Sequence, residues 1–291
     1  MNPKIVILTP VYNDWKNLDK LLRQIDKIFK RKIKNYFHLV VINDCSNEKY
    51  NLKKYRFKMI HKITLISLNK NVGSQRAIAI GIRYLNNFYK NKNFKTIIID
   101  SDGQDNPNII EKMLSISKKF PRFSIAINRG QRKEKLWFRF FYEIYCKLIK
   151  IFYFKEIRFG NFSLINHNHL KTLSKKKELW SAFPPSLSMN ISNLIHLTAN
   201  REKRYSGISK MNFFGLLKHA FRVFSALKLR VFLSSVMYIF IAFVLFFENS
   251  KLLFFVISFP LIIFNLINFF ISLRNKNEFK KNYKEVEIKF F

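Results

Sequence analysis

The stretch KTIIIDSDGQDNP, residues 95–107, changes from apolar to acidic within a few positions. Its first half is β-branched and apolar, which is typical of a strand buried on both faces. Asp100, Asp102 and Asp105 then follow closely, in a chain that has only 18 acidic residues against 53 lysines and arginines. Extended backbone points residues i and i+2 to the same side. We therefore expect Asp100 and Asp102 to share one side of a strand end.

Two carboxylates on the same side repel each other unless a cation lies between them. Oxygen ligands favour hard ions such as Mg²⁺ or Mn²⁺, which commonly link protein carboxylates to substrate phosphates. Gln104 has the same parity and could add a neutral oxygen. An acidic residue just before a helix is a simpler explanation that suits Asp105 but not Asp100. The pattern predicts that Asp100, Asp102 and Gln104 bind Mg²⁺ or Mn²⁺.

Similar apolar runs and segments of helical spacing alternate over the first 130 residues. The expected strands are 4–11, 37–44, 62–69, 95–100 and 123–129, and the expected helices are 15–31, 74–90 and 106–119. The third helix should begin with Asn106 as its N-cap and Pro107 at its first position. This alternation predicts an α/β fold with a mostly parallel sheet. In such sheets ligands bind beyond the carboxyl ends of the strands.

The bulk composition points to an anionic partner. The chain has 291 residues and a net charge of +35, which suits nucleic acid, a phosphate-bearing substrate or an acidic membrane surface. Codon bias toward A/T explains part of the lysine excess. The two cysteines, Cys45 and Cys146, form neither a disulfide framework nor a CxxC metal site.

The C-terminal part changes character. Residues 231–247 and 252–273 carry no charge, are long enough to span a bilayer, and are separated only by ENSK at 248–251. Basic residues flank the pair: Lys228, Arg230, Arg274, Lys276, Lys280 and Lys281. The positive-inside rule then places both flanks in the cytoplasm. We expect a multi-pass protein of the inner (cytoplasmic) membrane with a cytoplasmic catalytic domain; two buried helices of a soluble domain are the alternative.

Two further segments are amphipathic. Residues 134–154 have an apolar stripe opposite a charged face, and residues 211–228 set phenylalanines and leucines opposite basic side chains. The stripe in the first segment consists of Trp137, Phe140, Phe141, Ile144, Tyr145 and Leu148. Such helices suit the headgroup region, although packing onto the sheet remains the alternative. The predicted organisation is a catalytic domain over 1–210, an interfacial helix over 211–228, two transmembrane helices over 229–274 and a cytosolic tail over 275–291.

Seven motifs occur in an order that resembles a known family. They are TPVYND (9–14), VVINDCS (40–46), NKNVGSQRAIAIGI (69–82), IIIDSDGQDNP (97–107), INRGQR (127–132), GNFSLINHNHL (160–170) and RYSGISK (204–210). Together they resemble family 2 glycosyltransferases, in the branch related to dolichyl-phosphate mannose synthase and bacterial polyprenyl-phosphate glucosyltransferases. The resemblance covers residues 4 to about 225.

The resemblance implies a Rossmann-like GT-A fold that binds a nucleotide sugar, and inverting transfer of a sugar from a UDP- or GDP-sugar. It implies roles for specific residues. Pro10, Tyr12 and Asp44 would contact the base and ribose, and Asp14, Asn71 and Gly73 would also belong to the donor site. Arg204, Ser209 and Lys210 would engage phosphates, while Arg129, Arg132 and Arg139 would bind an acceptor phosphate. Asp100, Asp102 and Arg139 would act most directly in transfer.

The chain departs from the family pattern at three positions. Asn43 replaces the first aspartate of a usual pair, which puts one ribose or base contact in doubt. Gly103 replaces a common leucine. Glu143 stands where a serine often follows the acceptor-facing arginine. It would repel an acceptor phosphate if it pointed inward; a salt pair with Lys147 on the polar face of the helix is the equally weighted alternative.

The class of acceptor is inferred from the lack of an obvious general base in the sequence. Transfer to a hydroxyl generally needs a carboxylate that accepts the proton, whereas a phosphate monoester, with a second pKa of about 6, is already ionised. The chain lacks the ED and QxxRW motifs that processive synthases of this family carry, and Glu178 is the fallback base. These features favour a polyprenyl-phosphate acceptor; a hydroxyl of a cell-envelope glycan or glycolipid is the alternative.

A membrane-tethered basic protein that binds nucleic acid or anionic lipid is the non-enzymatic alternative. It predicts aromatic side chains interleaved with lysines on an exposed sheet, but the aromatics lie mainly in the membrane-type segments. The expected partners are therefore a nucleotide-sugar donor, a lipid-linked acceptor and the membrane, with no nucleic acid. A homo-oligomer is left open.

Overall fold

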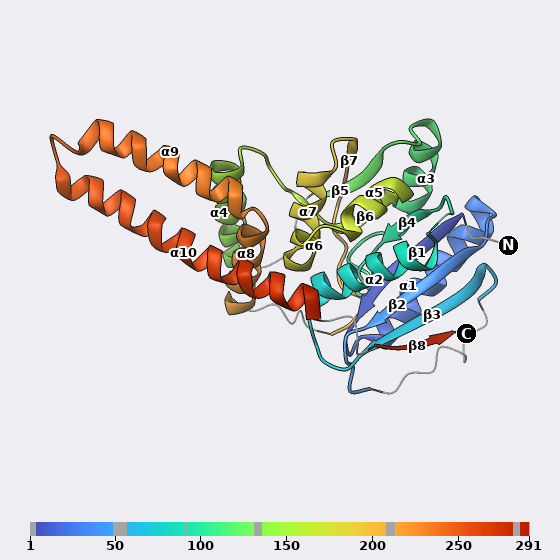
Figure 1. Cartoon of the computed structure of the whole chain (residues 1–291). Coiled ribbons are helices and arrows are strands. Elements are labelled where there is room, and N and C mark those ends of the chain that lie inside the picture. Colours follow the sequence, from blue (N-terminus) through green and yellow to red (C-terminus); the bar gives the residue numbers. More distant parts are fainter. Residues whose placement is uncertain are drawn as a thin grey trace.

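The computed structural model describes residues 4–48, 57–90, 92–130, 136–207, 213–281 and 286–290. Its α/β part is one mixed sheet covered by helices on both faces, and a long helical hairpin extends from one side of it (Figure 1). The strand order within the described residues is β7-β5-β6-β4-β1-β2-β3-β8.

The central strands have the expected parallel arrangement. β1 (Ile5–Val11) runs parallel to β2 (Phe37–Asn43) and to β4 (Lys95–Ile98), and β2 runs parallel to β3 (Ile60–Leu68). With β5 (Ser124–Arg129), these strands confirm all five strands that the apolar runs predict. Their carboxyl ends meet at one edge of the sheet, which positions the site described below.

Three strands were not predicted. β6 (Phe159–Asn166) lies antiparallel between β4 and β5, and β7 (Leu194–Ala199) runs parallel to β5. β8 (Val286–Phe290) comes from the C-terminal tail and pairs antiparallel with β3 at the sheet edge. The tail, to which the sequence analysis assigned only a cytosolic location, is therefore part of the sheet.

The helices between the strands lie close to the expected ranges. α1 (Trp15–Ile28) continues into a π-helical turn, Phe29–Ile33, and α2 spans Ser74–Phe88. α3 (Ile109–Lys119) begins three residues later than predicted, with Asn108 as its N-cap. The side chain of Asn106 instead accepts a hydrogen bond from the backbone N–H of Asn108 at 2.9 Å. The prediction that Asn106 is the N-cap was wrong because this side chain closes a local turn before the helix.

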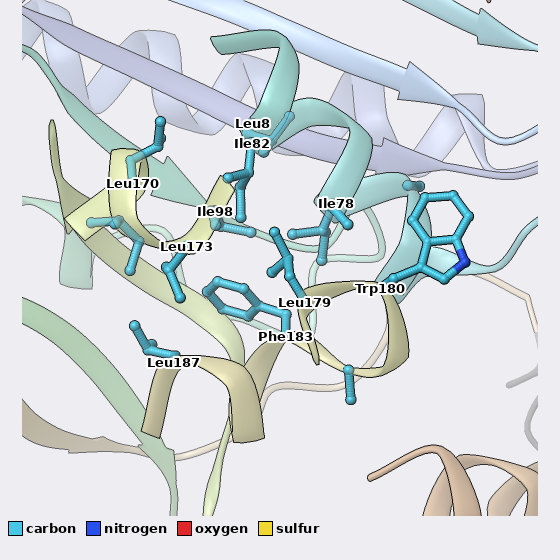
Figure 2. Close-up of a cluster of buried hydrophobic side chains, with 14 of the residues drawn as sticks. Leu8, Ile78, Ile82, Ile98, Leu170, Leu173, Leu179, Trp180, Phe183 and Leu187 are labelled. Carbon is cyan, nitrogen blue, oxygen red and sulfur yellow. The ribbon is translucent and has the colours of Figure 1, made fainter. Parts of the chain in front are cut away.

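The core has two parts, one on each face of the sheet. Alternate residues of β1 point to opposite faces, so Leu8 joins one apolar cluster and Ile7 joins the other. The first cluster packs α2 against α5 (His167–Ser174), α6 (Glu178–Ser181) and α7 (Phe183–Asn190) (Figure 2). A Cβ atom on Gly81 would collide with the side chain of Leu8, so the glycine permits close packing of α2 on β1.

The hairpin consists of two long helices. α9 spans Lys228–Phe246 and α10 spans Lys251–Lys281. Their apolar windows have mean hydropathies of 2.2 and 2.3, yet only 22% and 11% of those windows are buried. Core helices of a soluble domain would be mostly buried, so the exposure argues against that alternative. The described residues contain two such helices, which narrows the expected multi-pass arrangement to one hairpin.

The two amphipathic segments form helices at the base of the hairpin, α4 (Leu136–Tyr153) and α8 (Phe213–Ala226) (Figure 1). In α4 the predicted apolar stripe faces outward: Phe140 is 63% exposed, and Phe141, Ile144 and Leu148 are also exposed. A different set of residues, including Cys146 and Ile149, is buried. The side chain of Trp137 lies outside the described residues. The exposed stripe suits contact with lipid rather than with the sheet.

The C-terminal end of α10 is docked onto the α/β part. Arg76 of α2 forms an ion pair with Glu278 at 2.7 Å and donates a hydrogen bond to Asn275 at 2.8 Å. Asn275 in turn donates hydrogen bonds to Ser181 and Ser225. These contacts fix the hairpin relative to the sheet.

Candidate functional site

The candidate site lies where the carboxyl ends of β1, β2 and β4 meet. The loops after these strands carry Asp14, Asp44 and Asp100. The parallel pairing of the three strands brings these loops together, although the residues are far apart in sequence. This is the position at which parallel α/β sheets bind ligands.

The acidic turn after β4 concentrates negative charge. Burial, and secondarily the carboxylate of Asp102, raise the pKa of Asp100. Burial and the neighbouring Asp100 raise the pKa of Asp105 to about 7. One oxygen of Asp102 accepts a hydrogen bond from the backbone N–H of Gln104 at 3.0 Å. The carboxylates are close enough to repel one another. β4 ends at Ile98 and residues 101–103 form a turn, so the extended backbone that was expected to carry Asp100 and Asp102 is replaced by a turn.

A second segment, residues 201–206, lies across this turn. The backbone N–H groups of Glu202 and Tyr205 donate hydrogen bonds to the carbonyl oxygens of Gln104 and Asp102, at 2.9 and 3.1 Å. The guanidinium of Arg204 lies between two carboxylates, 2.6 Å from Asp14 and 3.3 Å from Asp102. Arg204 therefore supplies positive charge to the acidic turn.

The glycine of the turn is explained by this contact. Gly103 has a φ of 77°, and a Cβ atom there would collide with the ring of Tyr205. Only glycine adopts such backbone at little cost. The leucine that is common at this position in the family would not fit beneath Tyr205.

The donor atoms present fit a hard divalent cation in part. Among the described residues, no three His, Cys, Asp or Glu side chains form a complete metal-binding cluster. Asp100 and Asp102 nevertheless offer oxygen ligands whose mutual repulsion a cation would relieve. Mg²⁺ typically binds through one or two carboxylates and takes its remaining ligands from substrate phosphates and water. Gln104 was predicted as a third ligand, and the hydrogen bonds described for it involve its backbone N–H and carbonyl groups.

The loop after β2 is held by its own side chains. Asp44 accepts hydrogen bonds from the backbone N–H groups of Val72 and Gly73, at 2.7 and 2.8 Å. Burial raises the pKa of Asp44, and these two hydrogen bonds oppose that shift. Asn43, which replaces an aspartate of the family, accepts a hydrogen bond from Ser46 at 2.9 Å and closes the turn. Asp44 thus connects the strand end to the start of α2.

The other predicted donor-site residues lie at the same edge. Pro10 is buried within β1, whereas Tyr12 and Asn71 are exposed on the adjoining loops. Gly73 is the N-cap of α2 with a φ of 86°. Their contacts with a donor remain predictions.

Two further guanidinium groups, those of Arg129 and Arg201, lie near the acidic turn. Arg129, at the end of β5, crosses Gly160 so closely that a Cβ atom there would collide with its guanidinium. The charges of Arg129 and Arg201 both lower the pKa of Asp100 and of Asp105, which places these guanidinium groups near the turn. A small cavity beside the turn is lined in part by Arg129 and Arg201.

Helix α8 adds two groups that the sequence analysis did not identify. Burial, followed by the charges of Arg129 and Arg222, lowers the pKa of His219 to about 4. Arg222 lies one helical turn further along α8, and its guanidinium is 3.3 Å from the position of a Cβ atom on Gly73. The face of α8 that carries His219 and Arg222 therefore points toward the strand ends. Their i, i+3 spacing could have indicated this shared face.

The remaining predicted residues differ in position. Arg139 lies on an exposed part of α4. Arg132, Ser209 and Lys210 lie outside the described residues. Glu143 is 3.7 Å from Arg158, so an ion pair with the segment before β6 replaces the alternative pairing with Lys147. Glu178, the fallback base, is partly exposed at the start of α6.

Two buried amides near Asp100 were not predicted: Asn161, which bonds to Asp100, and Gln75, which bonds to Asn161. Both lie within motifs that support the family resemblance, at 69–82 and 160–170.

Comparison with known proteins agrees with this geometry. The family model for glycosyl transferase family 2 matches residues 6–177. An undecaprenyl-phosphate 4-deoxy-4-formamido-L-arabinose transferase of Proteus mirabilis is 25% identical over 139 residues. That match covers 47% of this chain and 40% of the relative, so the chain aligns with less than half of the relative's length.

Solved structures support the fold. Glucosyl-3-phosphoglycerate synthase of Mycobacterium tuberculosis, solved with Mn²⁺ and UDP-glucose, is similar with a TM-score of 0.54 at 10% identity. The similarity covers 79% of each chain. A second structure of the same enzyme, with Mn²⁺, UDP and glucosyl-3-phosphoglycerate, gives a TM-score of 0.53. The predicted α/β class and its GT-A relationship are confirmed.

Proposed function

Because the chain belongs to glycosyl transferase family 2, we propose that it transfers a sugar from a UDP- or GDP-sugar to a polyprenyl phosphate at a membrane surface. The observation that carries this proposal is the arrangement of charges around the acidic turn. The turn carries carboxylates suited to a cation, and the guanidinium groups of Arg129, Arg201 and Arg204, which are suited to phosphate, lie near them. Helix α8, which carries Arg222, leads directly into the apolar hairpin.

On the donor side, Asp100 and Asp102 would hold Mg²⁺ or Mn²⁺, which neutralises charge on the leaving diphosphate when it is bound. Arg204 is positioned beside the same carboxylates and can contribute a charge-assisted hydrogen bond to a phosphate oxygen. Support for the cation comes from the chemistry of the donor set and from the Mn²⁺ in the structurally similar synthase.

On the acceptor side, a phosphate monoester needs cations that orient it rather than a base that deprotonates it. Arg129 and Arg222 both lie near His219 and would supply these cations, whereas His219, with a pKa of about 4, is neutral and would contribute only a hydrogen bond. Arg139 on α4 lies on the exposed surface through which a lipid-linked phosphate would enter. The relative from Proteus mirabilis is named for an undecaprenyl-phosphate substrate, which supports this class of acceptor.

The membrane arrangement follows from α9 and α10. We propose that the two helices cross the membrane as a hairpin, with both flanks and the α/β part on the cytoplasmic side. The exposed apolar faces of α4 and α8 would then lie at the headgroup region.

One assay tests the proposal. Membranes that contain the protein are incubated with radiolabelled UDP- and GDP-sugars, and lipid is extracted. Label in the polyprenyl-lipid fraction, lost on mild acid hydrolysis, is the expected result. Label that appears only in a glycan or glycolipid would support transfer to a hydroxyl instead, and nucleotide-sugar hydrolysis without transfer would contradict both assignments.

The acceptor assignment makes a specific prediction for Arg139. Arg139→Ala should raise the KM for polyprenyl phosphate about tenfold or more, because it removes a charge-assisted phosphate contact, while donor affinity stays unchanged. Arg158→Ala is the matched control, since that exposed arginine pairs with Glu143 and Glu156. Equal losses of donor and acceptor affinity in Arg139→Ala would count against its assigned role.

A further inference from the structure

We propose that Gln75 and Asn161 are positioning residues that fix the carboxylate of Asp100 for binding the divalent cation. This inference rests on the proposed function, because it assigns the cation to the acidic turn. Neither residue is expected to touch the donor or the cation itself.

The three side chains form a continuous hydrogen-bond chain. The amide nitrogen of Asn161 donates to both oxygens of Asp100, at 2.9 and 3.3 Å. The amide nitrogen of Gln75 donates to the amide oxygen of Asn161 at 2.8 Å. The amide oxygen of Gln75 accepts from the backbone N–H of Phe183 at 2.8 Å. The chain therefore runs from α7, through α2 and β6, to the acidic turn.

The donor and acceptor order of these hydrogen bonds is fixed by the backbone N–H of Phe183. A backbone N–H can only donate, so Phe183 forces the oxygen of Gln75 to face it. The nitrogen of Gln75 must then face Asn161, and the nitrogen of Asn161 must face Asp100. Either amide could rotate by itself only by leaving a buried donor or acceptor unpaired. Asp100 is consequently always presented with a donor, which holds its carboxylate in one orientation.

Phe183, the last partner in this series of hydrogen bonds, is held in place by packing. Phe183 is fully buried in the apolar cluster between α2 and α7, beside Leu179 and Leu187 (Figure 2). Gln75 and Asn161 are also buried, with 7% and 5% of their surface exposed. Polar groups buried this deeply are stabilised only by their partners, so the packing of α7 is transmitted to the position of Asp100. Groups that orient metal ligands commonly act in this way.

The test measures Mn²⁺ binding directly, by electron paramagnetic resonance of the full chain in detergent, with and without UDP and GDP. Asn161→Leu and Gln75→Met keep the side-chain size and remove the hydrogen bonds. Each should weaken Mn²⁺ binding by about tenfold to a hundredfold. The matched control is Asn166→Leu, because Asn166 is an equally buried asparagine of the same strand that bonds to Arg122 and His169. Mn²⁺ affinity should not change in the control.

The double variant separates positioning from general destabilisation. If both amides act through Asp100, Gln75→Met adds little to the loss already caused by Asn161→Leu, whereas independent structural damage would add. If the wild-type protein binds Mn²⁺ and both Gln75→Met and Asn161→Leu bind it with unchanged affinity, the positioning role is overturned while the proposed function stands. Absence of Mn²⁺ binding in the wild-type protein would overturn the metal assignment of the proposed function, and with it the premise.

Discussion

Single residues set the charge balance of the site. Arg204 joins Asp14 and Asp102, which come from loops after different strands, and is only 20% exposed. The ion pairs are therefore sheltered enough to matter more than the usual surface pair. Without a cation, Arg204 compensates part of the negative charge at the turn.

Asp102→Asn tests this role. The substitution keeps the size of the side chain and removes its charge, so transfer should fall by at least about 100-fold, the scale typical for loss of one group that stabilises charge in the transition state. The dependence of the residual rate on Mn²⁺ should disappear. Asp19→Asn is the control, because Asp19, whose side chain is 17% exposed, forms an ion pair with Arg23 within α1. Full activity of Asp102→Asn in excess chelator would contradict the assignment.

At the scale of elements, the acidic turn and the 201–206 segment form one unit. Their backbones are joined by two hydrogen bonds, and the ring of Tyr205 packs against Gly103. The conformation of the turn therefore depends on a segment about a hundred residues further along the chain. This dependence accounts for a glycine at a position where relatives often carry leucine.

Gly103→Ala should disturb this unit. Left-handed backbone costs an alanine about 1–2 kcal/mol, and the new methyl group also displaces Tyr205. Gly207→Ala is a matched control for the backbone strain, since Gly207 has a φ of 79° and none of the described residues lies within 4 Å of its Cβ position. Thermal unfolding should show a larger loss for Gly103→Ala. Equal effects of both substitutions would show that the contact with Tyr205 is unimportant.

Some strands were predictable from the sequence and others were not. The five central strands were predictable because strands buried on both faces are nearly continuous in apolar residues. β6 was missed because Asn161, Ser163 and Asn166 interrupt that pattern with polar groups that hydrogen-bond inside the protein. β8 was missed because an edge strand is defined by its partner, β3, and not by its own composition. Within the site, the spacing of Asp100 and Asp102 predicts a role as cation ligands, which stays a prediction, whereas the contacts of Gln75 and His219 depend on tertiary packing.

For the whole molecule, the decisive feature is the connection between the hairpin and the sheet. α10 reaches beyond its apolar window, and Glu278 and Asn275 contact α2, α6 and α8. Arg76 also lies 5.3 Å from the ring of Trp180, which strengthens the same junction. The site is thereby held at a fixed orientation to the hairpin.

Glu278→Gln should loosen this junction. It removes the ion pair with Arg76, whose side chain is only 14% exposed, at a cost of about 1–3 kcal/mol. Hydrogen exchange should speed up at the end of α10 and the start of α2. Glu111→Gln, which breaks an exposed ion pair with Lys32, should leave exchange there unchanged. Identical exchange in both variants and the wild type would show that the ion pair does not hold the hairpin.

If α9 spans the membrane, the effect of a new charge on insertion should depend on its depth in the bilayer and not on the exposed fraction of the side chain. Phe240 and Leu229 are both exposed residues of α9, at 65% and 63%, but Phe240 lies mid-helix and Leu229 lies at the N-terminal end. Phe240→Lys should cost about 2.5–3.5 kcal/mol of insertion free energy and reduce the carbonate-resistant membrane fraction. Leu229→Lys should have little effect. Equal membrane fractions for the two variants would contradict a spanning helix.

In the proposed function, Asp100 and Asp102, which follow β4, bind a divalent cation together with the diphosphate of the donor. Anomalous scattering from crystals grown with MnCl₂ and UDP tests it most directly. The account predicts a manganese peak within ligand distance, about 2.0–2.6 Å, of Asp100 or Asp102, in contact with both phosphates of the nucleotide. A nucleotide bound elsewhere, or bound at this edge of the sheet with no manganese beside either carboxylate, would contradict the account.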